Sequence, residues 1–442
     1  MRQVLIVSPH FPPGDTVDMH RVRMTAPHYA SNGWRPVVLK VAAGDTGRRI
    51  DEGLLATLPP DLEVHEVAAP QTRLAAAAGL NAVGLRAWSA LDRAGRRLLS
   101  ERAFDLVFIS TTEFPVMALG RAWKRRFGVP FVLDFQDPWA TFPASATPYL
   151  RSSFKHRMMR SIHKLLESWT LPDADGLISV SASYVDLLRE VYPVLRGRPA
   201  LVSPFPYSAA DFAIATERGR SVAGLTRTDG DLTCLYAGRV APAQEPSLRA
   251  CLAVVAAGRR RRPELFDRLR FVFVGTGYAQ KGNPSVAGRL AIETGMNDRV
   301  VEYSDRIGFL DAQKSMLDAG LLLIIGSDDD GYTPSKLNQS LSLAKPVLCA
   351  APRASPAAKA VADLASVIAV FADEPETDLV IDALAARLES LIAGGSPTAY
   401  ADRDAHTAPF EAAMAAKRDC AFFDDVLQAA RSPGGWSEPH DR

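Results

Sequence analysis

Short apolar runs alternate with segments of helical spacing from the start of the chain. Residues 3–8 (QVLIVS) and 35–41 (RPVVLKV) are apolar runs of the length of a buried strand. Between them, residues 19–33 have the spacing of an amphipathic helix, which Asn32-Gly33 is expected to end. A strand, a helix and a second strand in this order predict a βαβ unit and therefore a parallel sheet.

The same pattern recurs along the chain and predicts two α/β domains. Further buried strands of the first half are predicted at residues 105–110, 130–135, 174–181 and 200–206. Beyond a polar stretch near residues 216–230, strands are predicted at residues 232–238, 269–277, 299–305, 320–326, 345–350 and 366–372. We therefore predict domains over 1–212 and 213–398. Residues 399–442 are expected to form a helical segment that packs back on the first domain and ends in a loose tail.

The composition limits the class of protein and the kinds of binding partner that the sequence allows. Lys and Arg total 51 against 50 Asp and Glu, so no whole-chain attraction to nucleic acid is expected. The four cysteines show no Cys-x-x-Cys spacing, which argues against a zinc site or a disulfide framework and fits the cytosol. The first apolar run is short for a signal peptide, and no stretch approaches the roughly eighteen apolar residues of a membrane span. These features predict a cytoplasmic protein.

The segment 321–348 (LLLIIGSDDDGYTPSKLNQSLSLAKPVL) carries the most unusual chemistry of the chain. Its acids, Asp328 to Asp330, follow an apolar run, where acids often hold a divalent metal. Pro334 is suited to the first position of a helix, which would place Ser335 and Lys336 in the first turn. Free N–H groups and the Lys charge would make that helix end an anion site. A surface Lys on a capped helix is the ordinary alternative, but the position after a buried strand favours function.

Other polar residues also follow predicted strands. Gly238-Arg239 follows one strand, and Arg239 could fork onto a diphosphate, although a turn with a solvated Arg gives the same pattern. Gly275-Thr276-Gly277 ends another strand, and this short pattern is more typical of a tight turn than of a dinucleotide fingerprint. Asp134 and Asp137 lie at or just past a strand end. Either acid could contact a substrate hydroxyl or act as a base, or could simply cap an Asp-Pro turn.

The loop after the first strand contains Gly14, where a main chain could approach a ligand. His10, Asp15 and His20 are nearby polar groups. The alternative is a Pro-rich loop with a helix cap at Asp18, and for the individual histidines we favour that alternative.

Basic and apolar residues interleave in segments 121–128 and 151–168, and an Ala/Leu-rich segment at 73–99 carries only Arg among its bases. Such helices can rest on an anionic membrane surface. Ordinary amphipathic helices with solvated faces are the favoured interpretation. Peripheral contact with the cytoplasmic face of a membrane is therefore kept as an expectation to test.

Several motifs together give the chain a resemblance to a known family. They are VSPHFPPG, DLVFISTTEFP, FVLDFQDPW, ADGLISVS, LYAGRV, FVFVGTG and YTPSKLNQSLSLAKPVL. With these motifs the chain resembles a glycosyltransferase of the GT-B fold over about residues 3–430, most like glycosyltransferase family 4, the retaining enzymes that use sugar nucleotides. The Pro-Ser-Lys-Leu helix followed by Pro-Val is the most specific part. The resemblance implies two Rossmann-like domains facing across a cleft, with the nucleotide held mainly by the C-terminal one.

The resemblance also implies roles for individual residues. Arg239 and Lys336 match the positions that neutralise the diphosphate, and Gly14 matches the N-terminal loop that closes over the phosphates. Arg306 and Ile307 match the region whose backbone reads the base, and residues 328–331 match the loop that contacts the transferred sugar. The donor-binding residues implied in this way are Gly14, Gly238, Gly275, Arg306, Ile307, Asp329, Asp330, Gly331, Tyr332, Thr333, Pro334, Ser335, Leu337 and Gln339.

The chain departs from the family pattern at three positions. Gln339 stands where the family typically has a Glu for the ribose hydroxyls; it can still hydrogen-bond but brings no charge. The usual partner Glu falls at Gly331, so that Asp329 or Asp330 would have to serve. The second phosphate-binding Lys of the family is Gln244 here, which leaves more of the charge to Arg239 and Lys336.

The resemblance implies transfer of a sugar from a nucleoside-diphosphate sugar to a hydroxyl of a glycan, lipid-linked or small-molecule acceptor, as in polysaccharide, glycolipid or other glycoconjugate synthesis. Positioned cations and N–H groups can stabilise the leaving diphosphate without a metal or another cofactor. The expected course is retention, without a protein nucleophile. If the enzyme inverts, it needs a base, for which Asp137 is the first candidate and Asp15 and His20 follow.

Three alternatives stay open from the sequence. A GT-A glycosyltransferase would use Asp328 to Asp330 to bind manganese, but would not have two α/β halves. A nucleotide-sugar epimerase can share the GT-B fold. A non-catalytic scaffold of this fold is kept open by Gln339 and Gln244.

Overall fold

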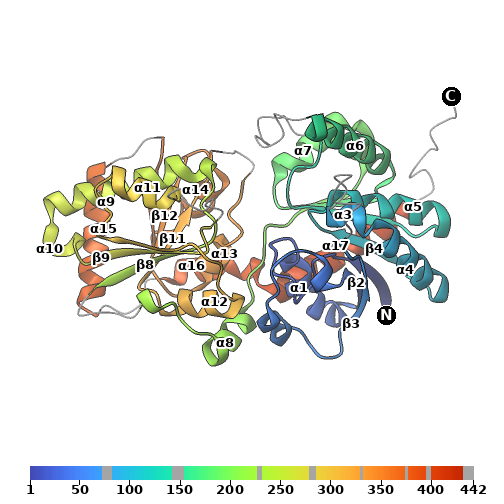
Figure 1. The fold of residues 1–442 in the computed structure, drawn as a ribbon, viewed down its shortest axis with the longest axis horizontal. Helices are drawn as coiled ribbons and strands as arrows, with labels where there is room; N and C mark the ends of the chain where they lie inside the picture. Colours follow the sequence, from blue (N-terminus) through green and yellow to red (C-terminus); the bar gives the residue numbers. More distant parts are fainter. Residues whose placement is uncertain are drawn as a thin grey trace. The chain divides into compact units, whose positions relative to one another are not determined.

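The computed structural model describes residues 1–71, 82–141, 154–225, 231–277, 285–328, 332–373, 377–394 and 400–431. The chain divides into two compact units (Figure 1). The first contains the chain up to Pro206 and the segment from Ala412 onward; the second is Tyr207–Glu411. The unit boundaries therefore lie after Pro206 and Glu411, whereas the sequence placed them after 212 and 398. Tyr207 donates its N–H to the Phe410 carbonyl at 3.0 Å, which ties both crossing segments to the second unit.

The first unit is built on a seven-stranded parallel sheet of order β3-β2-β1-β4-β5-β6-β7. Its strands are β1 (Arg2–Val7), β2 (Trp34–Val41), β3 (Glu63–Val67), β4 (Leu106–Ser110), β5 (Phe131–Phe135), β6 (Gly176–Ser179) and β7 (Ala200–Val202). Its α-helices are α1 (His20–Thr25), α3 (Val83–Arg86), α4 (Trp88–Glu101), α5 (Ala118–Phe127), α6 (Phe154–Thr170), α7 (Ala182–Val191) and α17 (Ala412–Arg431). Every strand predicted for this half is present, and β3 is the one that the prediction missed.

The predicted helix over 19–33 is interrupted. The α-helix α1 ends at Thr25, and two 3₁₀ turns follow at Ala26–His28 and Ala30–Asn32. Pro27 lies at the start of the first turn, where its missing N–H cannot continue the α-helical ladder. The predicted stop at Asn32-Gly33 is confirmed, because Gly33 closes the segment at φ 83°, a left-handed conformation that favours glycine.

The second unit is built on a six-stranded parallel sheet of order β10-β9-β8-β11-β12-β13. Its strands are β8 (Leu232–Ala237), β9 (Leu269–Val274), β10 (Val300–Tyr303), β11 (Leu321–Ile325), β12 (Val347–Ala351) and β13 (Val367–Phe371). Its α-helices are α8 (Ala209–Arg218), α9 (Glu245–Arg261), α10 (Pro263–Phe266), α11 (Val286–Glu293), α12 (Phe309–Asp318), α13 (Leu337–Ser342), α14 (Pro356–Val361), α15 (Thr377–Ile392) and α16 (Ala401–Thr407). All six predicted strands of this half are confirmed.

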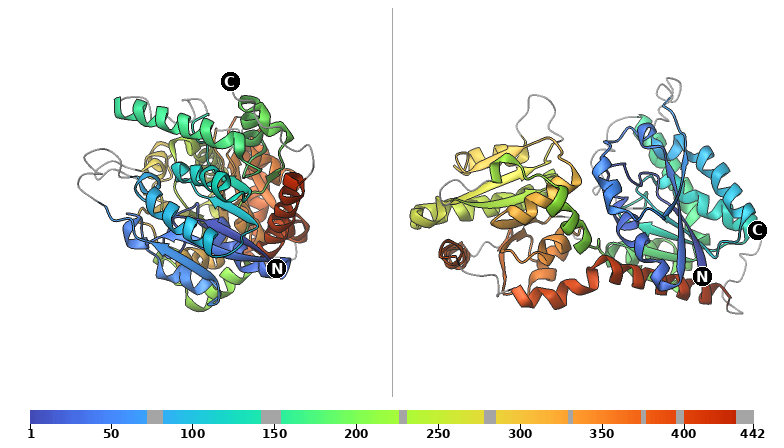
Figure 2. Two further views of the ribbon diagram at one scale, coloured as in Figure 1. Left: turned by 90° about the vertical axis from the view of Figure 1, so that its right-hand side faces the viewer. Right: turned by 90° about the horizontal axis from the view of Figure 1, so that it is seen from below.

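Helices lie on both faces of each sheet (Figures 1 and 2). In both units the strand order reverses beside the first strand, between β1 and β4 and between β8 and β11. This is the doubly wound order, in which ligands bind at the carboxyl ends of the strands near the reversal. The sheet topology therefore marks one candidate binding edge in each unit.

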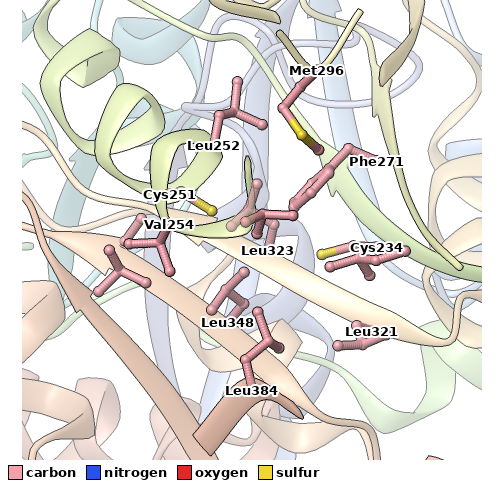
Figure 3. Packing of buried hydrophobic residues seen from close by; sticks show 14 of the residues in the cluster. Cys234, Cys251, Leu252, Val254, Phe271, Met296, Leu321, Leu323, Leu348 and Leu384 are labelled. Carbon is pink, nitrogen blue, oxygen red and sulfur yellow. The ribbon is translucent and has the colours of Figure 1, made fainter. Parts of the chain in front are cut away.

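The core of the second unit lies between its sheet and the helices α9 and α15. Figure 3 shows Leu323 and Leu348 of the sheet packed with Leu252 of α9 and Leu384 of α15. Cys234 and Cys251 lie in the same cluster, and all four cysteines of the chain are free and buried. Burial raises the pKa of Cys251 to about 12, so its thiol stays protonated.

The last described helix, α17, is part of the first unit and contacts α1. Phe423 of α17 packs edge-on against Tyr29 and Trp34, with ring centroids 5.7 and 5.4 Å apart. Gly176 leaves the space for this helix, because a β-carbon there would lie 2.6 Å from a Val426 methyl group. No described helix is long and apolar enough to span a membrane.

Candidate functional site

The predicted donor-binding residues of the second unit follow four adjacent strands. Because the strands are parallel, their carboxyl ends meet at one edge of the sheet. The residues at this edge are Gly238 and Arg239 after β8, Gly275 after β9, Arg306 and Ile307 after β10, and Tyr332 to Lys336 after β11. Asp329, Asp330 and Gly331 lie outside the described residues. The topology thus brings the described candidates to the edge where the strand order reverses.

Gly238 and Lys336 lie next to each other at this edge. A β-carbon on Gly238 would lie 3.8 Å from Cε of Lys336 and 3.6 Å from the hydroxyl of Tyr236. Arg239 follows directly and is exposed. Two cationic side chains from different segments of the chain therefore lie at the reversal point, where their charges favour an anionic ligand.

The Pro-Ser-Lys segment has a different backbone structure from the one predicted, because the helix begins later. Pro334 is not the first residue of the helix, because α13 begins at Leu337 and Lys336 is its N-cap. The Leu337 N–H donates to the Pro334 carbonyl at 3.0 Å, so that Pro334 to Leu337 form a turn ahead of a short helix. The predicted placement of Ser335 and Lys336 in the first helical turn is therefore wrong. A helix of six residues has a weak dipole, which leaves the charge of Lys336 as the main contribution.

The Gly275-Thr276-Gly277 segment is a tight turn held by β10 and the residues after it. Gly275 has φ 71°, and its N–H donates to the Tyr303 carbonyl at 2.8 Å. Thr276 donates its hydroxyl to Glu302 of β10. A β-carbon on Gly277 would lie 2.4 Å from the Ser304 carbonyl oxygen, so only glycine fits. The tight-turn interpretation agrees with these contacts.

The two glutamines that depart from the family pattern have different surroundings. Gln339 in α13 is 6% exposed, and its Oε1 has no hydrogen-bond partner within the described part of the chain. Gln244 is 3% exposed, and its carboxamide is engaged in hydrogen bonds with the protein. Gln339 therefore has an acceptor available, whereas Gln244 does not face outward as a phosphate ligand would.

In the first unit, Gly14 lies in the loop after β1. A β-carbon there would lie 2.6 Å from the His10 carbonyl oxygen, so packing inside the loop already requires glycine. Gly14 pairs with Ile50 in an isolated antiparallel bridge, and the N–H of Asp15 donates to the Arg49 carbonyl at 2.8 Å. These contacts fix the loop, and the role of Gly14 toward a donor stays a prediction.

His10 and Asp18 form a buried pair that the sequence analysis missed. Nδ1 of His10 lies 3.1 Å from both carboxylate oxygens of Asp18. Burial alone would lower the pKa of His10, but the Asp18 carboxylate outweighs it and raises the pKa above its ordinary value. Thr16 and Thr111 donate to the same carboxylate at 2.6 and 3.1 Å. The prediction that Asp18 caps a helix is wrong, because Met19 is the N-cap of α1 and no side chain caps it.

The two candidate acids after β5 differ in their surroundings. Asp134 is fully buried, and its Oδ2 accepts from Arg21 at 2.8 Å and from Ser110 and Gln136 at 2.7 Å. These contacts make Asp134 a structural residue. Asp137 is exposed just beyond the strand and remains the catalytic candidate of the pair.

The loop that carries Asp137 is held by α6. Glu167 accepts from the N–H groups of Ala140 and Thr141 at 2.5 and 3.0 Å. Trp139 donates its indole N–H to His163 at 3.1 Å and stacks on Phe114 at an angle of 10°. The backbone beyond Asp137 is thus fixed on a helix.

Three solved structures show what the architecture resembles. A UDP-forming α,α-trehalose-phosphate synthase from Burkholderia xenovorans, in complex with glucose-6-phosphate, has a TM-score of 0.61 at 12% identity, with 96% of this chain and 100% of that chain covered. WaaG, a glycosyltransferase involved in lipopolysaccharide biosynthesis, has a TM-score of 0.58 at 13% identity over 95% and 99%. A putative UDP-N-acetylglucosamine 2-epimerase from Listeria monocytogenes has a TM-score of 0.52 at 13% identity over 96% of both chains. At these identities the likeness shows the fold.

No curated protein sequence is significantly similar to the chain. The family model of the glycosyl transferase 4-like domain matches residues 20–205, which span most of the first unit before the chain crosses to the second. Residues 20–205 therefore match a glycosyl transferase 4-like domain, and the chain has the GT-B fold. The GT-A alternative is set aside, because the chain has two parallel sheets and its structural neighbours have the GT-B fold.

The sequence located the candidate residues of the second unit but not the contacts among them. The bonds of Gln244 reach the end of β11, and those of Asp18 reach Thr111 beyond β4. No short motif encodes either contact. Each contact joins segments that are far apart in the sequence, so the sequence pattern carried no signal for it.

Proposed function

We propose that the protein is a glycosyltransferase, which transfers a sugar from a nucleoside-diphosphate sugar to an acceptor hydroxyl, with the donor diphosphate bound at the carboxyl edge of the second sheet. The observation that carries the proposal is the adjacency of Lys336 and Gly238-Arg239 at the reversal between β8 and β11. Negative charge builds on the diphosphate as the anomeric C–O bond breaks. Fixed cations stabilise that charge in the transition state more than in the bound donor, which accelerates the cleavage.

The further course of the reaction is also a proposal. We expect the reaction to need no metal, because cations at this edge can neutralise the leaving group. We expect retention because the resemblance to glycosyltransferase family 4 implies it. The residues expected to contact the donor are those that the resemblance implied, with Gln339 offering an acceptor to a ribose hydroxyl. Asp137 is the base if the reaction inverts instead. The acceptor is expected to be a glycan, lipid-linked or small-molecule hydroxyl, in polysaccharide, glycolipid or other glycoconjugate synthesis in the cytoplasm.

A thermal-shift comparison of UDP, GDP, TDP and ADP tests the donor site directly. One nucleoside diphosphate at about a hundred times its dissociation constant should stabilise the protein by about 2.7 kcal/mol, or roughly 5–10 °C in Tm. The corresponding nucleoside without phosphates should give a smaller shift, because it makes no contact with Lys336 and Arg239. If no diphosphate shifts the Tm, the donor-site assignment is wrong.

Hydrolysis of a donor sugar by the purified protein would argue against the non-catalytic scaffold.

We also propose that α6 touches an anionic membrane surface. Met158 and Leu165 on this helix are 42% and 69% exposed, and Lys164 beside them is exposed. An apolar side chain next to a basic one can enter the headgroup region while the charge stays near anionic lipid.

Sedimentation with vesicles that contain an anionic phospholipid tests this contact. Leu165→Glu should lower vesicle binding by roughly tenfold or more, since burying one Leu contributes about 1.5–3 kcal/mol. Leu379→Glu is the matched control, because Leu379 is 67% exposed on α15 of the second unit. Equal binding by wild type and Leu165→Glu would contradict a role for α6.

A further inference from the structure

The strands β8 and β11 separate at the candidate donor edge. Their register contains only the pairs Leu321 with Cys234 and Leu322 with Leu235. Each strand stays paired with its other neighbour to its end, since Ala237 of β8 is opposite Val274 and Ile325 of β11 is opposite Ala350. The sheet is therefore open between β8 and β11 next to the Gly238-Arg239 turn.

Gln244 bridges this opening with its carboxamide. Its Nε2 donates to the Ile325 carbonyl of β11 at 3.0 Å and to the Tyr236 hydroxyl of β8 at 3.2 Å. Its Oε1 accepts from the N–H of Ala241 at 2.8 Å. The N–H of Asp328 adds a second tie by donating to the Ala243 carbonyl at 3.1 Å. Gln244 thus replaces backbone pairing where the two strands part.

Tyr236 extends this hydrogen-bonded connection to the backbone of Arg239. Its hydroxyl accepts from Gln244 and donates to the Arg239 carbonyl at 2.9 Å. Burial raises the pKa of Tyr236 above its ordinary value, and Tyr332 raises it further, so the hydroxyl keeps the proton that it donates. The chain of bonds runs from the end of β11 through Gln244 and Tyr236 to the turn that carries Arg239.

A glutamine is the residue type that this bridge requires. The carboxamide offers two N–H donors and one carbonyl acceptor, and all three functions are used here. Lys has no acceptor for Ala241 and would place a charge at a site that is 3% exposed, and Glu has no donor for Ile325. The lysine that the resemblance leads one to expect at 244 could not make these contacts.

We infer that Gln244 is a positioning residue, which holds Arg239 in place for the donor diphosphate through Tyr236 instead of contacting the phosphates as a lysine would. This inference rests on the proposed function of the same edge. On this interpretation the neutral residue at 244 has a structural role in the site. Where the family pattern has a charged Lys, the uncharged Gln244 gives rigid support to the neighbouring Arg239.

Calorimetric binding of the nucleoside diphosphate that the thermal-shift comparison selects tests the inference. Gln244→Glu keeps the shape of the side chain but loses both donors, and it should weaken diphosphate binding by about tenfold or more while binding of the nucleoside stays unchanged. Tyr236→Phe cuts the same connection with a smaller change and should weaken diphosphate binding in the same selective way. Gln313→Glu is the matched control, because Gln313 is another buried glutamine of this unit, 2% exposed in α12, and α12 contributes no residue to the connection.

A double-mutant cycle separates a positioning role from loss of fold. If Gln244 acts through Arg239, Gln244→Glu should cause no further loss of diphosphate binding in an Arg239→Ala background. Tighter diphosphate binding by Gln244→Lys would overturn the inference, because it would make 244 a phosphate-contact position. Equal binding by wild type, Gln244→Glu and Tyr236→Phe would also overturn it while leaving the donor site intact. No diphosphate binding by the wild type would instead overturn the proposed function and this inference with it.

Discussion

Replacing Lys336 with Ala is expected to lower the turnover number of sugar transfer by about 10²–10³-fold, with the fold intact. Removing one positioned group that stabilises transition-state charge costs about 2.7–4 kcal/mol in comparable sites. Lys336 is half-buried at the N-cap of α13, and its Cε lies beside Gly238. Arg239→Ala is expected to have an effect of the same order, because the two cations share the charge of the leaving diphosphate.

The measurement is the initial rate of sugar transfer, or of donor hydrolysis, at saturating donor. Lys314→Ala is the control, since Lys314 in α12 of the same unit pairs with Asp318 at 2.5 Å in an i, i+4 pair and such exposed pairs contribute little. Loss of kcat in Lys336→Ala with an unchanged KM for donor would mark a contact made in the transition state. Normal rates in both Lys336→Ala and Arg239→Ala would rule out the site.

The strands that the sequence predicted share one physical property, and the strand that it missed lacks that property. The predicted strands are apolar runs bounded by turn residues, because strands inside a parallel sheet are covered on both faces. β3 pairs only with β2 at the edge of its sheet, and three of its five residues from Glu63 to Val67 are polar. Its half-exposed positions do not form an apolar run, so the pattern that identified the others could not identify it.

The sequence could predict the part of the candidate site that follows from the sheet topology. Parallel strands place the residues that follow them at one edge, and this is why Gly238, Gly275 and Lys336 could be grouped from the sequence alone. Which polar side chains are engaged within the protein is decided by contacts between distant segments. Asp134 and Asp137 look equivalent in the sequence, and contacts with distant residues such as the buried Arg21 distinguish them. The start of α13 was misplaced for a local reason, since Pro334 fits a turn as well as it fits a helix start.

Replacing Arg21 with Met is expected to lower the free energy of unfolding by about 3–5 kcal/mol, because it leaves a buried carboxylate without its partner. Arg21 and Asp134 are both fully buried and are joined at 2.8 Å. The Arg21 guanidinium also donates to the hydroxyl and the carbonyl of Ser203 at 3.1 and 2.6 Å. Urea unfolding followed by circular dichroism measures the loss. Arg21→Met/Asp134→Asn should recover a large part of it, whereas Arg97→Met on the exposed face of α4 should change little.

The loss in Arg21→Met should depend on pH, because a second buried acid lies in the field of the same arginine. Burial raises the pKa of Asp419 to about 6, and the charge of Arg21 is the leading influence that lowers it. An acid whose pKa is raised on folding stabilises the fold most at low pH, and that contribution is lost as the pH rises through its folded pKa. Without Arg21 the pKa of Asp419 rises further, so the deficit of Arg21→Met should grow between about pH 5 and pH 8. A deficit that stays constant over this range would contradict the influence of Arg21 on the pKa of Asp419.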